Sequence, residues 1–196
     1  PSITGILMMM PLPGHIHEEK MIEMIHPYKD MDGLTTVNAG RLFSGKDGLF
    51  GGTPRAVMAI LKHYGISVEG KHAVIIGRSN VIGKPVAMML MQKNATVTIC
   101  HSRTKNLSEI TQQADILVTA VGKAGCVTAD MVKPGAIVLD VGINRIHGKT
   151  VGDVDYESVF PVAGAVTPVP GGVGSVTTTM IIESIVKAGE HAAGIK

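Results

Sequence analysis

The sequence predicts an α/β fold built on a parallel β-sheet, and two observations carry this prediction. Four short apolar runs, over 72–76, 95–100, 115–120 and 136–141, read as strands. Segments with helical spacing or loops separate them, an alternation typical of parallel sheets. The first run has no polar interruption and stops at a glycine, as expected of a strand that is buried on both faces.

Three further elements are expected ahead of these strands. The apolar run 5–10 reads as a strand. Because a lone strand needs partners, we expect that Pro1 is not the natural start of the protein. Residues 17–26 carry apolar side chains at helical spacing, with two glutamates in the first turn. Thr53 reads as the N-cap of a further helix, which Gly65 ends.

Two elements are expected at the carboxyl-terminal side. The loop 167–174, TPVPGGVG, combines prolines that fix φ with glycines that let a ligand approach the backbone. A linker without chemistry is the alternative interpretation of this composition. Residues 176–191 have apolar side chains at the spacing of an amphipathic helix, which we expect to pack against the rest of the chain.

The stretch after the first predicted strand is the strongest functional signal. Gly77, Ser79 and Gly83 lead into a predicted helix over 82–93, with Pro85 in its first turn. Such a corner points unpaired backbone N–H groups and the positive end of a helix dipole at one spot, which suits a phosphate. The spacing differs from the usual G-x-G-x-x-G pattern, so a plain strand–helix turn is the alternative.

The end of the second predicted strand indicates which dinucleotide would bind. In a Rossmann unit, an acidic residue at this place binds the ribose 2′-hydroxyl of NAD. Ser102 and Arg103 stand here instead, and Arg78 follows the first strand. Hydroxyl and guanidinium donors suit a 2′-phosphate, so the sequence favours NADP over NAD. Solvated surface charges are the alternative interpretation of the two arginines.

Composition argues against several classes of partner. A net charge of +2 over 196 residues, with no Trp, offers neither a basic surface nor stacking platforms, so we expect no nucleic-acid partner. No apolar run is long enough for a membrane span. Cys100 and Cys126 form no disulfide framework, which favours the cytoplasm. His15, His17 and His26 lack Cys or acidic partners at ligand spacing, so we expect no metal site.

Eight ordered segments resemble the methylenetetrahydrofolate dehydrogenase/cyclohydrolase family. They are GIL and PLPGHI within 5–16, PYKDMDG (27–33), GRSNVIGKP (77–85), NATVTICHSRT (94–104), ADILVTAVGK (114–123), GAIVLDVGIN (135–144), GDVDY (152–156) and TPVPGGVG (167–174). The resemblance implies a Rossmann-like NADP-binding domain over 53–175. It also implies the remnant of an N-terminal α/β folate domain over 1–52, and a C-terminal helix, 176–196, that packs back on the folate domain.

The resemblance implies an activity and a set of site residues. The activity is NADP-dependent oxidation of 5,10-methylenetetrahydrofolate to the methenyl form, with hydrolysis to 10-formyltetrahydrofolate, in a cytoplasmic homodimer. The implied cofactor contacts are Gly77, Arg78, Ser79 and Ile82, with Ser102 beside the 2′-phosphate and Ile143 beside the nicotinamide. The implied folate contacts are Asp32, which would hydrogen-bond the pterin, and Pro168, Gly171 and Gly172 of the closing loop.

Three departures from the family pattern affect the hydrolytic step. The family's catalytic Lys and its nearby Tyr would lie upstream of Pro1, so no catalytic residue is assigned here. Met9 stands where the family has a Gln that orients this Lys, and Met cannot make those hydrogen bonds. Gly51 and Gly52 replace a Pro-Cys pair and read as a looser loop. The alternatives are an NADP-dependent dehydrogenase of another pterin and a non-catalytic NADP-binding fragment.

Overall fold

The computed structural model describes residues 3–195 and confirms the predicted α/β class. Its core is a five-stranded parallel sheet with the order β2-β1-β3-β4-β7. The strands are β1 (His72–Ile76), β2 (Thr96–Cys100), β3 (Ile116–Thr119), β4 (Ile137–Asp140) and β7 (Ala165–Val166). The first four lie where the sequence predicts them, whereas β7 adds an edge strand of two residues beside β4.

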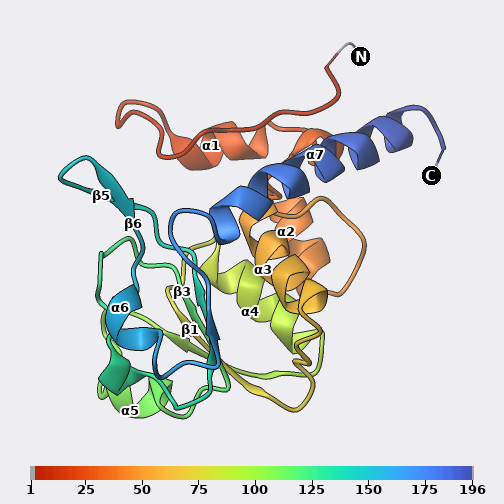
Figure 1. Cartoon of the computed structure of the whole chain (residues 1–196). Coiled ribbons are helices and arrows are strands. Elements are labelled where there is room, and N and C mark those ends of the chain that lie inside the picture. Colours follow the sequence, from red (N-terminus) through yellow and green to blue (C-terminus); the bar gives the residue numbers. More distant parts are fainter. Residues whose placement is uncertain (1–2, 196) are drawn as a thin grey trace.

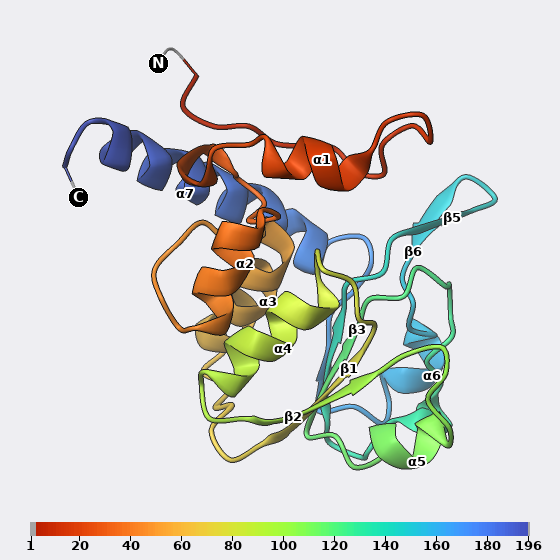
Figure 2. The same cartoon turned by 180° about the vertical axis from the view of Figure 1, so that it is seen from behind.

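Helices cover both faces of this sheet (Figures 1 and 2). One face carries α3 (Gly52–His63), α4 (Gly83–Met91) and the start of α7 (Val173–Ala192), and the other carries α5 (Leu107–Thr111), η2 (Ala129–Met131) and α6 (Tyr156–Val159). Ile75 of β1 packs into the first layer and Val74 into the second, and both are fully buried. Two apolar layers therefore explain why the β1 run has no polar residue in it.

The amino-terminal run 5–10 does not form the predicted strand. Only an isolated parallel bridge joins Ile6 to Asp30, where the Ile6 N–H donates to the Lys29 carbonyl at 2.6 Å. One bridge leaves the rest of the run without a strand partner, and Met9 as a whole residue is 76% exposed. The predicted helix over 17–26 is likewise shorter: α1 (Glu18–Glu23) has six residues and buries none of them.

The start of α3 corrects two interpretations of the sequence. The N-cap residue is Gly51 and the helix begins at Gly52, so Thr53 is not the cap. Both glycines are buried, and a Cβ added at Gly52 would lie 2.9 Å from Cγ1 of Ile181 on α7. The pair is therefore a site of close helix approach and not a loose loop. Gly65 follows the helix with φ +65°, as predicted for the residue that ends it.

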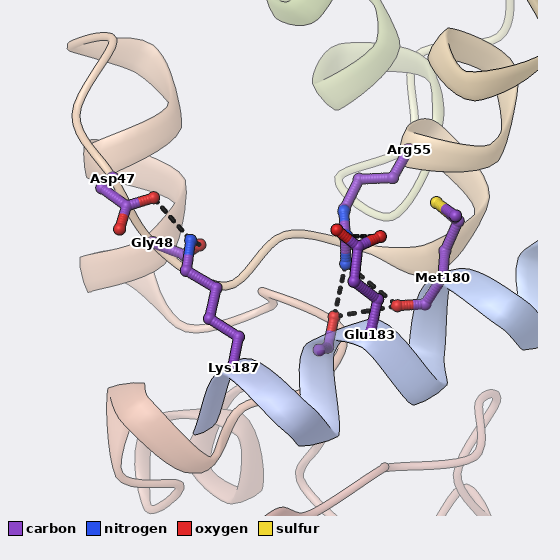
Figure 3. Close-up of polar contacts among 7 residues, drawn as sticks. Asp47, Gly48, Arg55, Met180, Glu183 and Lys187 are labelled. Carbon is purple, nitrogen blue, oxygen red and sulfur yellow. Dashed lines mark hydrogen bonds and ion pairs between the residues drawn. The ribbon is translucent and has the colours of Figure 1, made fainter. Parts of the chain in front are cut away.

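The carboxyl-terminal helix α7 begins at Val173, three residues earlier than predicted, so the proline–glycine loop spans 167–172. In both views α7 runs between the amino-terminal segment with α1 and the pair of α2 (Thr36–Phe43) and α3 (Figures 1 and 2). Arg55 of α3 holds it by donating to the Met180 carbonyl at 3.0 Å and to Ser184 Oγ at 2.6 Å (Figure 3).

Several short elements have no counterpart in the sequence prediction. Helix α2 starts after Thr35, whose Oγ1 accepts a hydrogen bond from the Asn38 N–H at 3.4 Å. The 3₁₀ turn η1 (Pro27–Lys29) precedes it. An antiparallel hairpin of β5 (Asn144–Ile146) and β6 (Lys149–Val151) follows β4 and projects from the body of the molecule (Figure 1).

Candidate functional site

A cavity of about 550 Å³ lies beyond the carboxyl ends of β3 and β4. This is the edge at which parallel sheets bind ligands, and the volume suits an organic ligand. The walls are the loops that follow β3 and β4, Thr150 of β6, the segment 168–172 and the amino ends of α3, α4 and α7. The site is therefore assembled from segments that are far apart in the sequence.

Three helix amino ends border the cavity, through Thr53 of α3, Ile82 before α4 and Val173 of α7. Each helix presents the positive end of its dipole there, which favours an anionic ligand. Gly122 and Gly142 form other parts of the wall, where the backbone is not covered by a side chain. The cavity thus combines positive potential with accessible backbone.

The turn after β1 needs its two glycines for steric reasons. Gly77 has φ +126°, and a Cβ added there would lie 2.5 Å from the Ala120 carbonyl oxygen. A Cβ added at Gly83 would overlap the carbonyl of Gly77. The turn therefore packs tightly against the loop after β3, which brings the β1 corner next to the cavity wall.

The amides at this corner are only partly free, which corrects the sequence interpretation. Ser79 Oγ accepts from the N–H groups of Ile82 at 3.1 Å and Gly83 at 3.4 Å, and its carbonyl accepts from the Lys84 N–H at 3.1 Å. Ser79 thus pairs three amides that were expected to be unpaired. A phosphate at this corner would have to use the other amides of the turn and the helix dipole.

The predicted residues of the 2′-phosphate site lie at the ends of neighbouring strands. Ile76 of β1 pairs with Cys100 of β2, and Arg78 and Ser102 each follow two residues later. Both side chains are exposed, as is that of Arg103. None of the three lines the cavity. They lie beyond the carboxyl ends of β1 and β2, and β1 is the neighbour of β3, whose following loop forms a wall of the cavity.

The cavity lining brings together half of the residues that the family resemblance implies. Ile82, Ile143, Pro168, Gly171 and Gly172 line it, whereas Asp32, Gly77, Arg78, Ser79 and Ser102 do not. The Ile143 residue is 68% exposed, and its Cδ1 would lie 3.9 Å from a Cβ added at Gly174. This apolar side chain therefore lies next to the start of α7.

Asp32 lies at the amino end of α3. Its half-buried carboxylate accepts a hydrogen bond from the Gly52 backbone N–H, and the next residue, Thr53, lines the cavity. Burial raises the pKa of Asp32 above its usual range, and the neighbouring Asp30 adds to this rise while Gly52 opposes it. Gly33, the residue after Asp32, has φ +63°, as is typical of a turn.

Two buried acids at the site were missed from the sequence. Asp140 ends β4 and lines the cavity, and Asp153 follows β6. Burial raises the pKa of Asp140, against the opposing effect of hydrogen bonds from the amides of Val154, Asp153 and Gly142. The available signal was an acid at the end of an apolar strand. The pattern of apolar residues along the strand does not show whether such an acid is buried or exposed.

Two kinds of feature are absent from residues 3–195. Within that part of the chain, no group of three or more His, Cys, Asp or Glu side chains is arranged to hold a metal ion. Among the helices there, none combines the length and apolar character needed to cross a membrane.

Comparison with known proteins identifies the family. A family profile described as tetrahydrofolate dehydrogenase/cyclohydrolase, NAD(P)-binding domain, matches residues 51–193. A protein of Paracidovorax citrulli named bifunctional protein FolD is 54% identical over 195 residues, which is 99% of this chain and 69% of the relative.

Solved structures agree with the sequence comparison. The bifunctional FolD enzyme of Campylobacter jejuni superposes with a TM-score of 0.94 at 48% identity, covering 96% of this chain and 68% of its own. The FolD enzyme of Trypanosoma brucei, solved with NADP cofactor and an inhibitor, gives a TM-score of 0.92 at 35% identity and covers 97% of this chain and 68% of its own. The chain belongs to the tetrahydrofolate dehydrogenase/cyclohydrolase family, as its eight sequence segments predicted.

Proposed function

We propose that this protein oxidises 5,10-methylenetetrahydrofolate to 5,10-methenyltetrahydrofolate with NADP. The observation that carries this proposal is 54% identity over 195 residues to a relative named bifunctional protein FolD. The position of the cavity supports it, because dinucleotides bind at this edge of a parallel sheet.

The residues around the cavity fit a phosphorylated dinucleotide. Helix amino ends supply positive potential, and the glycine walls leave room for close approach to the backbone. In the proposed arrangement Gly77, Arg78, Ser79 and Ile82 hold the cofactor, and Ser102 lies beside the 2′-phosphate. When bound, NADP supplies a nicotinamide ring that accepts a hydride. Ile143 would orient that ring by covering one of its faces.

The folate would lie between Asp32 and the loop 168–172. The Asp32 carboxylate can accept two N–H donors from the pterin edge, and such paired, charge-assisted bonds fix the orientation of a ring. Pro168, Gly171 and Gly172 would close over folate and cofactor. As the hydride and its two electrons leave the methylene carbon, a nitrogen lone pair of the folate forms the C=N bond of the methenyl product. The chain's task in this step is proximity and orientation.

Hydrolysis to 10-formyltetrahydrofolate is the second proposed step, and we infer that it is weaker. It needs an activated water and positioned proton transfers. Met9 stands where an amide would orient the family's Lys, and a thioether cannot donate a hydrogen bond. The dehydrogenase step does not need that contact.

The proposed organisation follows the family. Residues 1–52 would form the C-terminal part of the folate domain, 53–175 would bind NADP, and 176–196 would pack back on the folate domain. We also infer a homodimer, which sedimentation analysis would test. A cytoplasmic location is inferred from the two free thiols, Cys100 and Cys126, and cell fractionation would test it.

The test is an assay of the protein for NADPH formation from 5,10-methylenetetrahydrofolate, with NAD in parallel. We expect turnover that prefers NADP, and a raised KM for folate after Asp32→Ala. Tight NADP binding without turnover would instead indicate a non-catalytic NADP-binding protein. Faster turnover of another reduced pterin, with folate affinity unchanged by Asp32→Ala, would indicate a different dehydrogenase.

A further inference from the structure

The base of the β5–β6 hairpin holds two carboxylates that take no part in the steps described above. Asp140 at the end of β4 is 3% exposed, and Asp153 after β6 is fully buried. In the hairpin, Asn144 pairs with Val151, so the segments that enter and leave it run side by side (Figure 1). The two carboxylates therefore lie at the base of the hairpin, one where the chain leaves β4 and the other where it returns after β6.

Asp140 fixes the hairpin to the end of β4. Its Oδ1 accepts from the Gly142 N–H at 2.9 Å and from the Asp153 N–H at 3.0 Å, and its Oδ2 accepts from the Val154 N–H at 2.9 Å. A Cβ added at Gly152 would overlap this carboxylate. Because Asp140 also lines the cavity, a change there would alter the site directly.

Asp153 points the other way, into the turn that follows β3. Its Oδ2 accepts from the N–H groups of Val121 at 2.7 Å and Gly122 at 3.1 Å, and its Oδ1 accepts from the Lys123 N–H at 2.8 Å. Three successive amides that converge on one anion form the kind of concavity that binds phosphate in other proteins. Here the chain's own carboxylate fills it, so this turn is fixed before any ligand arrives.

Asp153 also holds the loop that follows β4. Its Oδ1 accepts from Asn144 Nδ2 at 2.9 Å, and a Cβ added at Gly142 would overlap the carboxylate. Gly122 and Gly142 line the cavity, whereas Asp153 does not. One buried charge therefore ties together two cavity walls without touching the space between them.

We propose that Asp153 is a positioning residue for the cofactor: it sets the spacing of the loops after β3 and β4 that hold the nicotinamide half of NADP. This inference rests on the proposed function, because it assigns the cavity between those loops to NADP. The folate contact Asp32 lies at the amino end of α3 and shares none of these hydrogen bonds. Loss of the Asp153 charge should therefore weaken NADP binding and leave folate affinity unchanged.

The first variant is Asp153→Asn, which keeps the shape and removes one acceptor oxygen. The remaining oxygen can still serve the amides of Val121 and Gly122. The new NH₂ group then faces two donors, the Lys123 N–H and Asn144 Nδ2. Because unpaired buried donors are costly, the Kd for NADP by titration calorimetry should rise about fivefold or more. Hydrogen exchange of the apo protein should accelerate at residues 121–123.

The second variant tests whether the effect depends on which side of the Asp153–Asn144 contact carries the carboxylate. Asn144→Asp alone sets a second carboxylate against Asp153 and should also weaken NADP binding. Combined with Asp153→Asn, the new carboxylate accepts from the new NH₂ group, and the net charge returns to that of the wild type. The double variant should therefore bind NADP more tightly than either single variant. Such coupling is expected only between groups in direct contact, whereas general destabilisation would accumulate.

The control is Asp115→Asn at the opposite end of the sheet. Asp115 accepts from the His72 N–H at 2.9 Å and from Lys133 Nζ at 2.7 Å, so its loss should lower Tm. The Kd for NADP should not change. Comparison of Asp153→Asn with this variant separates positioning of the cofactor loops from a contribution to stability alone.

The outcomes separate the inference from the proposed function. Wild-type turnover with NADP tests the function, whereas the NADP Kd values test the role of Asp153. In active protein, Asp153→Asn should raise KM for NADP and leave KM for folate unchanged. The inference is overturned if the folded single variant binds NADP within about twofold of the wild type, or if the double variant binds no better than Asp153→Asn.

If Asp153→Asn does not fold, a milder substitution provides the test. Asn144→Ala removes one of the donors to Asp153 and no part of the β3 turn. A rise of about threefold in the NADP Kd would support the role of Asp153, because a single hydrogen bond has an effect of this size. An unchanged Kd in that variant would overturn it.

Discussion

Replacement of Arg55 by methionine should loosen the contact between α7 and α3. The Arg55 side chain is only 21% exposed, and it pairs with Glu183 at 2.6 Å. It also donates to the Met180 carbonyl and to Ser184 Oγ (Figure 3). Methionine keeps most of the length and the apolar contact of the side chain but removes every donor.

The expected loss in the free energy of unfolding depends on how buried each group that Arg55 contacts is. A hydrogen bond that involves a charged group contributes about 1.5–3 kcal/mol, and Arg55 makes two such bonds to buried or backbone oxygens. Relief of the desolvated guanidinium offsets part of this loss, so Arg55→Met should lower the free energy of unfolding by about 2–3 kcal/mol. The Glu183 side chain is 62% exposed, and Glu183→Gln should therefore cost only about 0–1 kcal/mol.

Urea unfolding of the protein, followed by circular dichroism, would measure these differences in stability. Lys187→Met is the matched control, because it removes a cation of α7 that also contacts the preceding part of the chain. Lys187 donates to Asp47, whose side chain is 85% exposed, and to the Gly48 carbonyl at 3.1 Å. Because the Lys187 side chain is itself 44% exposed, water screens these contacts and they should together contribute only about 1 kcal/mol. If Glu183→Gln or Lys187→Met lowered the free energy of unfolding as much as Arg55→Met does, burial would not decide the cost of losing a charged contact and the expectation would be wrong.

Three further predictions concern the site and acid stability. Folate should bind fully above the raised pKa of Asp32, and its affinity should fall as pH drops through that pKa, which KM for folate against pH would measure. Asp32→Asn should bind folate weakly at every pH. A pH profile in this variant that equals that of the wild type would contradict the assignment. Met9→Gln should raise the ratio of cyclohydrolase to dehydrogenase rate, and a wild-type ratio near one would count against the role of Met9. The pKa of Asp115 is lowered chiefly by its hydrogen bond with Lys133, so its contribution to stability is present above the unfolded-state pKa and lost as pH falls through the folded-state value. Asp115→Asn should abolish that part of the acid-induced loss in urea unfolding, and an unaltered slope would contradict it.

The parallel sheet was predictable because each central strand is buried on both faces. Val74 and Ile75 face opposite layers and are both apolar, so the run is visible without any tertiary information. The run 5–10 is equally apolar, yet it finds only one bridge partner. Apolar composition alone cannot distinguish a strand with neighbours from one without them.

The candidate site was predictable only in part. Glycines and prolines near strand ends pointed to the loops that line the cavity, including Gly172 and Pro168. Ser79, expected to leave amides free, instead pairs with them through its own oxygens. Asp153 was not recognised, because its role depends on a hairpin that brings it to the turn after β3. Such contacts between distant segments leave no local pattern in the sequence.

The contribution of α7 to the cavity has a consequence for biosynthesis. Walls from α3, α4 and the sheet precede Val173 in the chain, whereas α7 leaves the ribosome only after all of them. The pocket cannot be complete until this late helix has docked on α3. Ligand binding in this cavity would therefore report that α7 has been synthesised and has docked on α3.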